Sequence, residues 1–186
     1  MPIRTSRSLG ACVAVALAAT GSMAATGSPA RALLADQVCT GTWTVTYNPP
    51  ITNTLQTVSA VLRADFPYCT DPEAPSASYS QAFTDTVSCA TLLNTGSAAH
   101  TFVWGNPAAK PSTFTYDWTV SDIGGQAVIT STGRIASGKY TPDGAEQISV
   151  LVTPNPLQCA FSGVATLTGP TTLTILRLSD SAVSAY

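Results

Sequence analysis

Few residues of this 186-residue chain have side chains that could carry out chemistry. His100 is the only histidine, so any arrangement of a serine, a histidine and an aspartate would have to contain it. No G-x-S-x-G or S-x-x-K motif accompanies it in the sequence. His100 alternates with Phe102 and Trp104, which predicts a position on the apolar side of a strand. We therefore expect a structural histidine and no catalytic residue.

Carboxylates offer a second route to chemistry, because a pair facing each other across a groove can hydrolyse glycosides. Asp85 and Asp117 are the two acids within segments expected to be strands, and most of the others fall in turns or on threonine-rich faces. The sequence does not tell whether these two face each other. A hydrolase built on Asp85, Asp117 or His100 is therefore the weakest of the functions considered.

The acids also indicate no metal site. Asp71-x-Glu73 and Asp143-x-x-Glu146 could donate oxygen atoms to calcium, but neither has the spacing of an EF-hand loop. Zinc is not indicated, since no two cysteines have C-x2-4-C spacing and the chain has one histidine. We expect neither a metal nor an organic cofactor.

The first 32 residues have the three parts of a secretory signal peptide. Arg4 and Arg7 precede an apolar run from Leu9 to Ala19, and small residues around Ala24 and Ala32 offer cleavage sites, of which the second is favoured. The run is too short to span a bilayer. The sequence predicts a signal peptide over 1–32, a secreted domain over 33–178 and a frayed tail over 179–186.

Four cysteines remain after the leader and its Cys12: Cys39, Cys69, Cys89 and Cys159. An even number in an exported chain predicts two disulfides, because the compartment outside the membrane is oxidising. Three pairings are possible. A hairpin turning at residues 48–53 favours Cys39–Cys69 with Cys89–Cys159. The main rival joins Cys69 to Cys89 and Cys39 to Cys159.

Composition excludes several classes of protein. Hydrophobic residues make up 45% of the chain and charged residues 10%, which is unlike a disordered segment. Eight basic residues against ten acidic ones cannot supply the basic surface of a nucleic-acid-binding protein. The chain is rich in Thr and Val, which favours strands over long helices.

The elements that must position these residues are strands. From Cys39 to Tyr47 apolar side chains alternate with a run of threonines, and Thr113 to Val120 alternates in the same way. Turn residues recur every 8–12 positions, which is typical of an all-β sandwich or barrel. We predict one all-β domain, a single antiparallel β-sandwich, immunoglobulin-like or jelly-roll-like, of about nine or ten strands. The expected strands include Thr54–Ala64, Ala77–Val87, Leu157–Phe161, Val164–Leu167 and Thr172–Leu178.

Five aromatic residues occupy the apolar positions of these strands: Trp43, Tyr47, Trp104, Tyr116 and Trp118. Aromatic side chains at such positions usually fill a core. If they were exposed on one face of a sheet, they could instead stack on sugar rings. We expect core packing and retain the binding platform as the alternative.

Several short motifs resemble a family of small exported proteins of actinomycetes. They are Cys39-x-Gly41-Thr42, Val45-Thr46-Tyr47-Asn48-Pro49, Trp104-Gly105, Thr132-Gly133-x-Ile135-x-Ser137-Gly138-x-Tyr140 and Leu157-x-Cys159. The resemblance implies a secreted β-sandwich of uncharacterised function and supplies no catalytic residue. The order Cys89, Trp104, Cys159 is similar, more weakly, to immunoglobulin domains.

The sequence thus favours a secreted, non-catalytic extracellular binding or surface module. Its expected partner is an extracellular protein or polysaccharide, with no nucleic acid and no membrane after signal cleavage. The alternatives are a surface-structural protein that self-associates through sheet edges and, less favoured, the secreted hydrolase.

Overall fold

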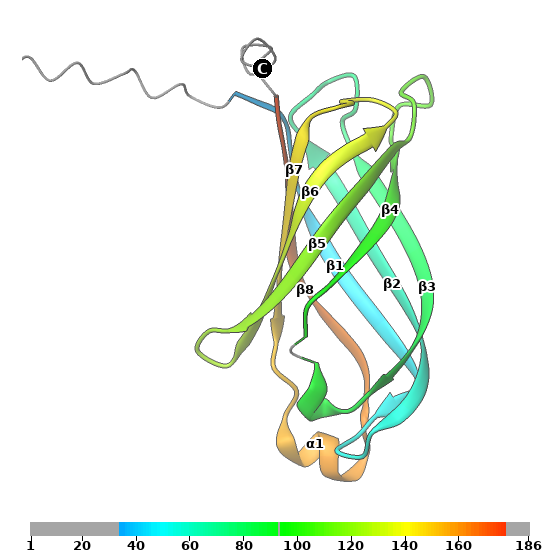
Figure 1. Ribbon diagram of the computed structural model, residues 1–186, viewed down its shortest axis with the longest axis vertical. Helices are drawn as coiled ribbons and strands as arrows, with labels where there is room; N and C mark the ends of the chain where they lie inside the picture. Colours follow the sequence, from blue (N-terminus) through cyan, green and yellow to red (C-terminus); the bar gives the residue numbers. More distant parts are fainter. Residues whose placement is uncertain (1–33, 93, 178–186) are drawn as a thin grey trace, which may run out of the picture. The chain divides into compact units, whose positions relative to one another are not determined.

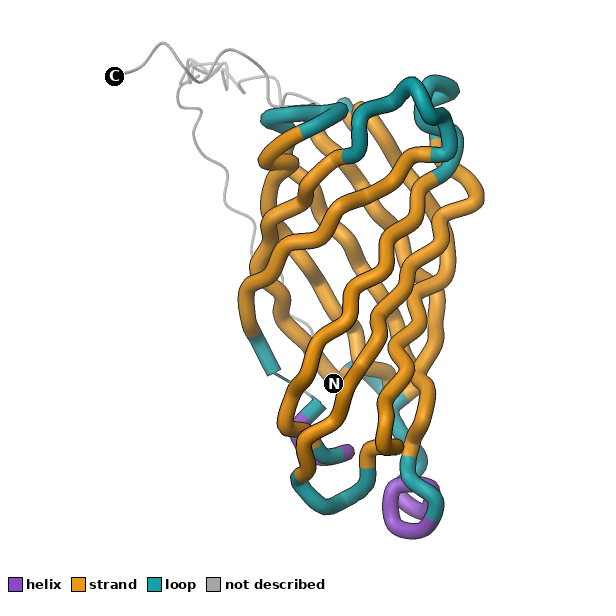
Figure 2. The backbone as a smooth tube through the Cα atoms, turned by 90° about the vertical axis from the view of Figure 1, so that its right-hand side faces the viewer, coloured by secondary structure: helices purple, strands orange, loops and turns teal. Residues whose placement is uncertain are grey.

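The computed structural model describes residues 34–92 and 94–177 as a closed barrel of eight antiparallel strands (Figure 1). Each strand pairs with the next, and the first pairs with the last. Figure 2 shows the strands tilted around the barrel, as closure of a sheet requires. The strands are β1 (Ala35–Ile51), β2 (Gln56–Cys69), β3 (Ala77–Val87), β4 (Gly96–Trp104), β5 (Ser112–Asp122), β6 (Gln126–Ser137), β7 (Gly144–Val152) and β8 (Val164–Leu176). A 3-10 turn, η1 (Cys89–Thr91), follows β3, and a short helix, α1 (Pro156–Phe161), precedes β8.

The predicted β-sandwich of nine or ten strands is therefore wrong, although the fold is all-β. Alternation shows which residues of a strand share a face, and that pattern is the same in a sandwich and in a barrel. The pairing of β1 with β8 decides between them, since Cys39 lies opposite Leu173 and Val45 opposite Leu167. The pairing of β1 with β8 also excludes the immunoglobulin-like and jelly-roll-like architectures.

The predicted strand Leu157–Phe161 is the helix α1. Asn155 caps it, because its side chain accepts a hydrogen bond of 2.9 Å from the backbone N–H of Leu157. Pro156 occupies the first helical turn, where its missing N–H has no partner to lose. Short-range capping signals thus override the apolar residues that suggested a strand.

The predicted strands Val164–Leu167 and Thr172–Leu178 correspond to one strand, β8, which runs through Gly169 and Pro170 and ends at Leu176; Leu178 lies outside the described residues. A Cβ atom at Gly169 would lie 1.8 Å from the carbonyl oxygen of Val150 on β7. The glycine therefore marks a close approach of two strands and not a break between them.

The predicted alternation of inner and outer side chains is confirmed along β1. Trp43 and Val45 are buried inside the barrel, while Thr42 and Thr46 are exposed. Threonine hydroxyls on the outer wall also pair between strands, as Thr44 and Thr168 do at 2.9 Å. Such cross-strand pairs stabilise neighbouring strands of a sheet.

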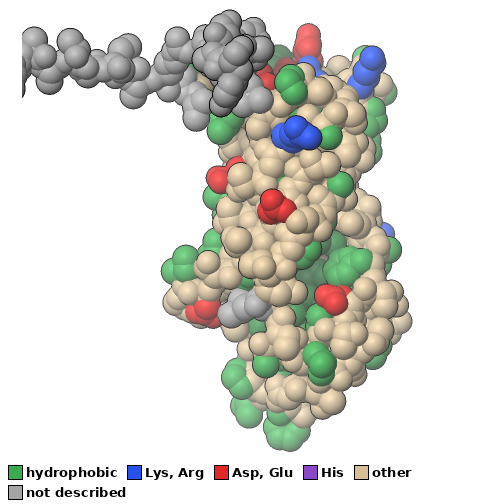
Figure 3. Space-filling model, in the orientation of Figure 1, with side chains coloured by type: hydrophobic (Ala, Val, Ile, Leu, Met, Phe, Trp, Pro, Cys, Tyr) green, Lys and Arg blue, Asp and Glu red, His purple; other side chains and the backbone are tan. Residues whose placement is uncertain are grey.

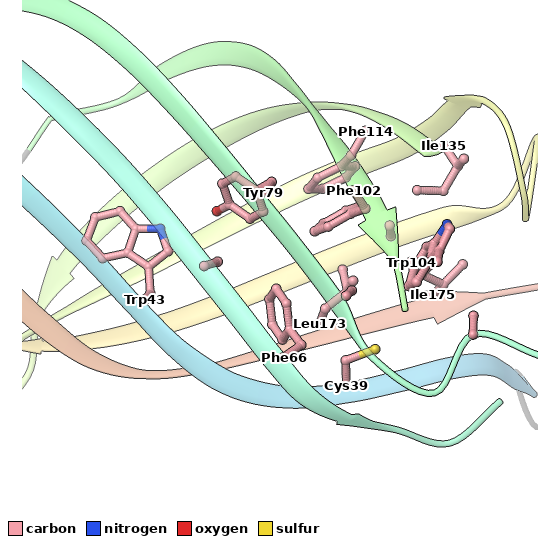
Figure 4. Packing of buried hydrophobic residues seen from close by; sticks show 14 of the residues in the cluster. Cys39, Trp43, Phe66, Tyr79, Phe102, Trp104, Phe114, Ile135, Leu173 and Ile175 are labelled. Atoms are coloured by element: carbon pink, nitrogen blue, oxygen red, sulfur yellow. The ribbon is translucent and has the colours of Figure 1, made fainter. Parts of the chain in front are cut away.

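Two separate hydrophobic clusters fill the barrel. The larger contains the rings of Phe66, Phe102 and Phe114, which Figure 4 shows packed together between the strands. The smaller lies where α1 and η1 meet the strand ends and consists of Ile51, Val58, Val87, Cys159 and Val164. Tyr47 and Leu167, both partly buried, contact both clusters. The two clusters therefore meet at Tyr47 and Leu167.

The two disulfides join the cysteines in the favoured pairing. Cys39 on β1 is bonded to Cys69 at the end of β2, and these two residues lie opposite each other in the strand register. Cys89 of η1 is bonded to Cys159 of α1. The second bond therefore fastens two short segments at one end of the barrel.

The predicted signal peptide, residues 1–32, and the predicted tail, residues 179–186, lie outside the described residues. Within the described part of the chain, no helix is both long and apolar enough to cross a membrane.

Candidate functional site

The structure does not bring the three hydrolase candidates together. Asp117 faces the outer wall, where its carboxylate accepts a hydrogen bond from the hydroxyl of Ser97. It lies in an open depression of about 500 Å³ that also contains Thr132 and Arg134. His100 is buried on the opposite face of the sheet. Asp117 and His100 therefore cannot act on one substrate.

Two of the acids considered as calcium ligands, Asp71 and Glu73, instead pair with basic or hydroxyl side chains. Asp71 lies 3.1 Å from the Nζ atom of Lys139 and accepts a hydrogen bond of 2.6 Å from the hydroxyl of Tyr140, and Glu73 lies 3.0 Å from the same Nζ atom. Burial raises the pKa of Asp71, but the hydrogen bonds from Tyr140, from the Glu73 backbone and from Lys139 outweigh it and lower the pKa overall. No group of three or more metal-ligating side chains occurs in residues 34–92 and 94–177.

The five candidate aromatic residues all lie at inward positions. Trp43 and Trp104 are buried in the larger cluster, which confirms core packing for these two. Tyr47, Tyr116 and Trp118 are only partly buried. None of the five lies on the outer wall, so they do not form an exposed platform there on which sugar rings could stack.

The barrel wall is incomplete between β3 and β4. These strands share two residue pairs, Ala77 with Trp104 and Ser78 with Val103, whereas β3 pairs with β2 along its whole length. Figure 1 shows β3 and β4 diverging toward the end that carries α1. Figure 3, in the same orientation, is hollowed there, with hydrophobic side chains and one acidic side chain visible within. We call this opening the seam and define its two edges as residues 80–86 of β3 and 96–101 of β4.

One edge of the seam presents Phe83 and Asp85. They lie opposite Ala60 and Val58 of β2, which are buried inside the barrel, so Phe83 and Asp85 also face inward. Inward-facing side chains are normally covered, yet Phe83 is 38% exposed and Asp85 is exposed. The missing strand pairing therefore opens the interior to solvent at these two residues.

The other edge of the seam is lined by an aromatic ring, the indole of Trp118. Trp118 of β5 lies opposite Gly96 of β4, and a Cβ atom at Gly96 would come within 2.3 Å of the indole ring. The indole therefore covers the bare backbone of Gly96, and its N–H donates to the side-chain oxygen of Asn94 at 3.4 Å. If β3 and β4 kept the register of their two pairs, Asp85 would lie opposite Gly96 and Phe83 opposite Ala98.

His100 stands at the inner end of the seam. It is 7% exposed, and its ring stacks on that of Tyr79 with 3.6 Å between the ring centres. Its Nδ1 atom lies 3.3 Å from the hydroxyl of Tyr116. Burial lowers the pKa of His100 to about 3, so the imidazole is neutral at pH 7. Its Nε2 atom is buried and has no hydrogen-bond partner among the described residues.

A network of neutral polar groups continues behind His100. The hydroxyl of Tyr79 and the side chain of Gln147 are hydrogen-bonded at 3.1 Å, and Gln147 in turn contacts Ser149 and Thr171. Figure 4 shows the indole ring of Trp43 on the side of Tyr79 that carries the hydroxyl. Buried polar atoms are almost always paired, so an unpaired Nε2 beside a satisfied network is an exception that calls for a partner.

This arrangement is suited to binding a small molecule. It combines apolar and aromatic walls, a carboxylate at the mouth and an unpaired imidazole nitrogen at the inner end. Pockets for small molecules have this character, with few polar groups in a mostly apolar lining. Sequence reasoning missed Phe83 and Asp85 as a pair. The signal was present, because Asp85 follows the same alternation as Tyr79, Phe83 and Val87 and is therefore an acid at an inward position.

Comparisons of the chain with protein-family models, with curated proteins and with solved structures found no match. The resemblance to small exported actinomycete proteins therefore stays a prediction.

Proposed function

We propose that this protein is an exported, non-catalytic binding module that holds a small organic molecule in the seam between β3 and β4. The observation that carries the proposal is the exposure of Phe83 and Asp85, two inward-facing residues, beside the two neighbouring strands that share the fewest residue pairs in the barrel. Closed eight-stranded barrels commonly hold one small ligand in their interior.

The packing of the interior supports a small ligand over a polymer. Ala60 and Val58, which lie opposite Phe83 and Asp85, belong to the larger and the smaller hydrophobic cluster respectively, so the zone reached through the seam is lined closely by buried side chains and suits a small molecule. A sugar chain or a protein would instead need an extended surface. The partly buried side chains of this zone, including Tyr47 and Leu62, would be covered by a bound molecule.

Export rests on the signal-peptide pattern of residues 1–32 and on the two disulfides, which persist in oxidising compartments. The pairing of β1 with β8 removes the two edges that an open sheet would leave, so self-association through sheet edges would have to use the unpaired edges of the seam.

A matched pair of substitutions on β4 tests the proposal. Ala98→Phe places a ring in the seam opposite Phe83, whereas Ala99→Phe places the same ring on the outer wall. The probe is N-phenyl-1-naphthylamine, a neutral dye that fluoresces in apolar surroundings. We expect the wild type and Ala99→Phe to bind it alike and Ala98→Phe to lose at least tenfold in affinity.

Thermal unfolding of both variants checks that they fold. If Ala98→Phe does not, Phe83→Ala with Val61→Ala as the outer-wall control replaces the pair, and Phe83→Ala is then expected to weaken binding. Equal binding by the inner and the outer variant, or no binding by the wild type, would overturn the proposal.

A further inference from the structure

We propose that the seam selects a ligand with a positive charge, an organic ammonium compound whose charged nitrogen lies beside Asp85 and whose apolar body packs on Phe83 and Trp118. This inference rests on the proposed function and names the chemical class of the ligand. Three features of the seam support it: its charge, its aromatic rings and the neutral groups at its inner end.

The charge of the seam is negative and uncompensated. The Asp85 carboxylate accepts a hydrogen bond of 2.7 Å from the backbone N–H of Thr86, and no salt bridge involves it in the described part of the chain. Lys139 and Arg177 are paired with other acids. The remaining basic residues described, Arg63, Lys110 and Arg134, are exposed on the outer wall or in a loop. An inward-facing carboxylate without a partner favours a cation.

Aromatic rings surround the position that the cation would take. Tyr47 and Phe83 both lie opposite Ala60, one on each side of β2, so their rings flank a small side chain. Burial first and the charge of Asp85 second raise the pKa of the Tyr47 hydroxyl to about 12. Trp118 covers the opposite edge. Aromatic faces attract ammonium groups, most strongly where the cation is shielded from water.

The inner end of the seam supplies no charge of its own. Burial keeps His100 neutral at pH 7, and the groups behind it are the neutral side chains of Tyr79 and Gln147. A carboxylate ligand would therefore meet Asp85 at the mouth and no positive group within. A neutral apolar tail can lie along this end, and the unpaired Nε2 atom of His100 can hydrogen-bond to one polar group on it.

Three naphthalene probes that share one apolar body test the inference. They are (2-naphthylmethyl)trimethylammonium, 2-naphthalenemethanol and 2-naphthoate, and their dissociation constants are measured by calorimetry at pH 7. The wild type should bind the cation at least tenfold more tightly than the alcohol, and the anion most weakly. Asp85→Asn should weaken the cation about tenfold and leave the alcohol within twofold. Asp85→Lys should reverse the order of cation and anion.

Asp117→Asn is the matched control, because Asp117 also lies within a strand but faces the outer wall. It should change none of the three affinities. If the alcohol binds and Ala98→Phe abolishes its binding, but Asp85→Asn leaves the cation unaffected, the charge inference is wrong and the proposed function stands. If none of the probes binds the wild type, the proposed function fails and the inference fails with it.

Discussion

Replacement of His100 by glutamine should remove a specific part of the acid sensitivity of the barrel. The folded imidazole has a pKa of about 3 because it is buried, while a histidine in an unfolded chain titrates near 6.5. Between these values the unfolded state binds a proton that the folded state does not. Stability therefore falls as the pH falls below about 6.5, since the state that binds more protons gains from acid.

The size of the effect follows from the two pKa values. Each unit of difference corresponds to about 1.4 kcal/mol, and between pH 7 and pH 4.5 the unfolded imidazole gains about 2.5 kcal/mol. The titratable groups that face His100 are the hydroxyls of Tyr79 and Tyr116. Burial raises the pKa of both, so neither titrates in this range.

Urea unfolding of the wild type and His100→Gln at pH 7, 6, 5 and 4.5 measures the difference. Carboxylates contribute equally to both proteins, so the comparison of the two slopes isolates the imidazole. The wild type should lose about 2.5 kcal/mol more than the variant over this range. Parallel losses would show that His100 takes up a proton in the folded state, and the description of a dry, neutral imidazole would then be wrong.

Three further changes test how the barrel is held together. Asp71→Asn should lower the free energy of unfolding by about 1–3 kcal/mol at pH 7, because the Tyr140 hydroxyl and the Lys139 ammonium lose a charged partner; denaturant titration measures this. Replacing Cys89 and Cys159 together by serine should cost about 4 kcal/mol, since the bond closes a separation of 70 residues; an unchanged unfolding midpoint would contradict the estimate. Gly169→Ala should destabilise the barrel by roughly 1–3 kcal/mol, because the added methyl group meets the Val150 carbonyl; unchanged thermal unfolding would show that β7 and β8 lie further apart.

The local features of the fold could be predicted from the sequence, because they depend on neighbouring residues. Alternation correctly placed Trp43 and Val45 inside and the threonines of β1 outside. The Cys39–Cys69 pairing followed from a hairpin, which is also a local structure. The number of strands could not be predicted in this way. In the sequence Gly169-Pro170 resembles a break between two strands, but β7 approaches closely at Gly169 and β8 continues through both residues.

The closure of the sheet and the seam depend on contacts between distant parts of the chain. No residue near Cys39 indicates that it will lie opposite Leu173. Asp85 was recognisable as an acid within a strand, but its exposure depends on the failure of β3 to pair with β4 beyond Ser78. The sequence of a strand does not show which of its two edges will lack a hydrogen-bonded neighbouring strand.

Amide hydrogen exchange, followed residue by residue by NMR, tests the existence and use of the seam most directly. In the free protein, backbone amides of residues 80–86 and 96–101 that point into the seam should exchange much faster than amides paired within β1 and β8. Addition of (2-naphthylmethyl)trimethylammonium should slow amide exchange along both edges of the seam. The exchange rates of amides away from the seam should stay unchanged. Slow exchange along both edges in the free protein would mean that β3 and β4 are paired throughout, and the binding site described above would not exist.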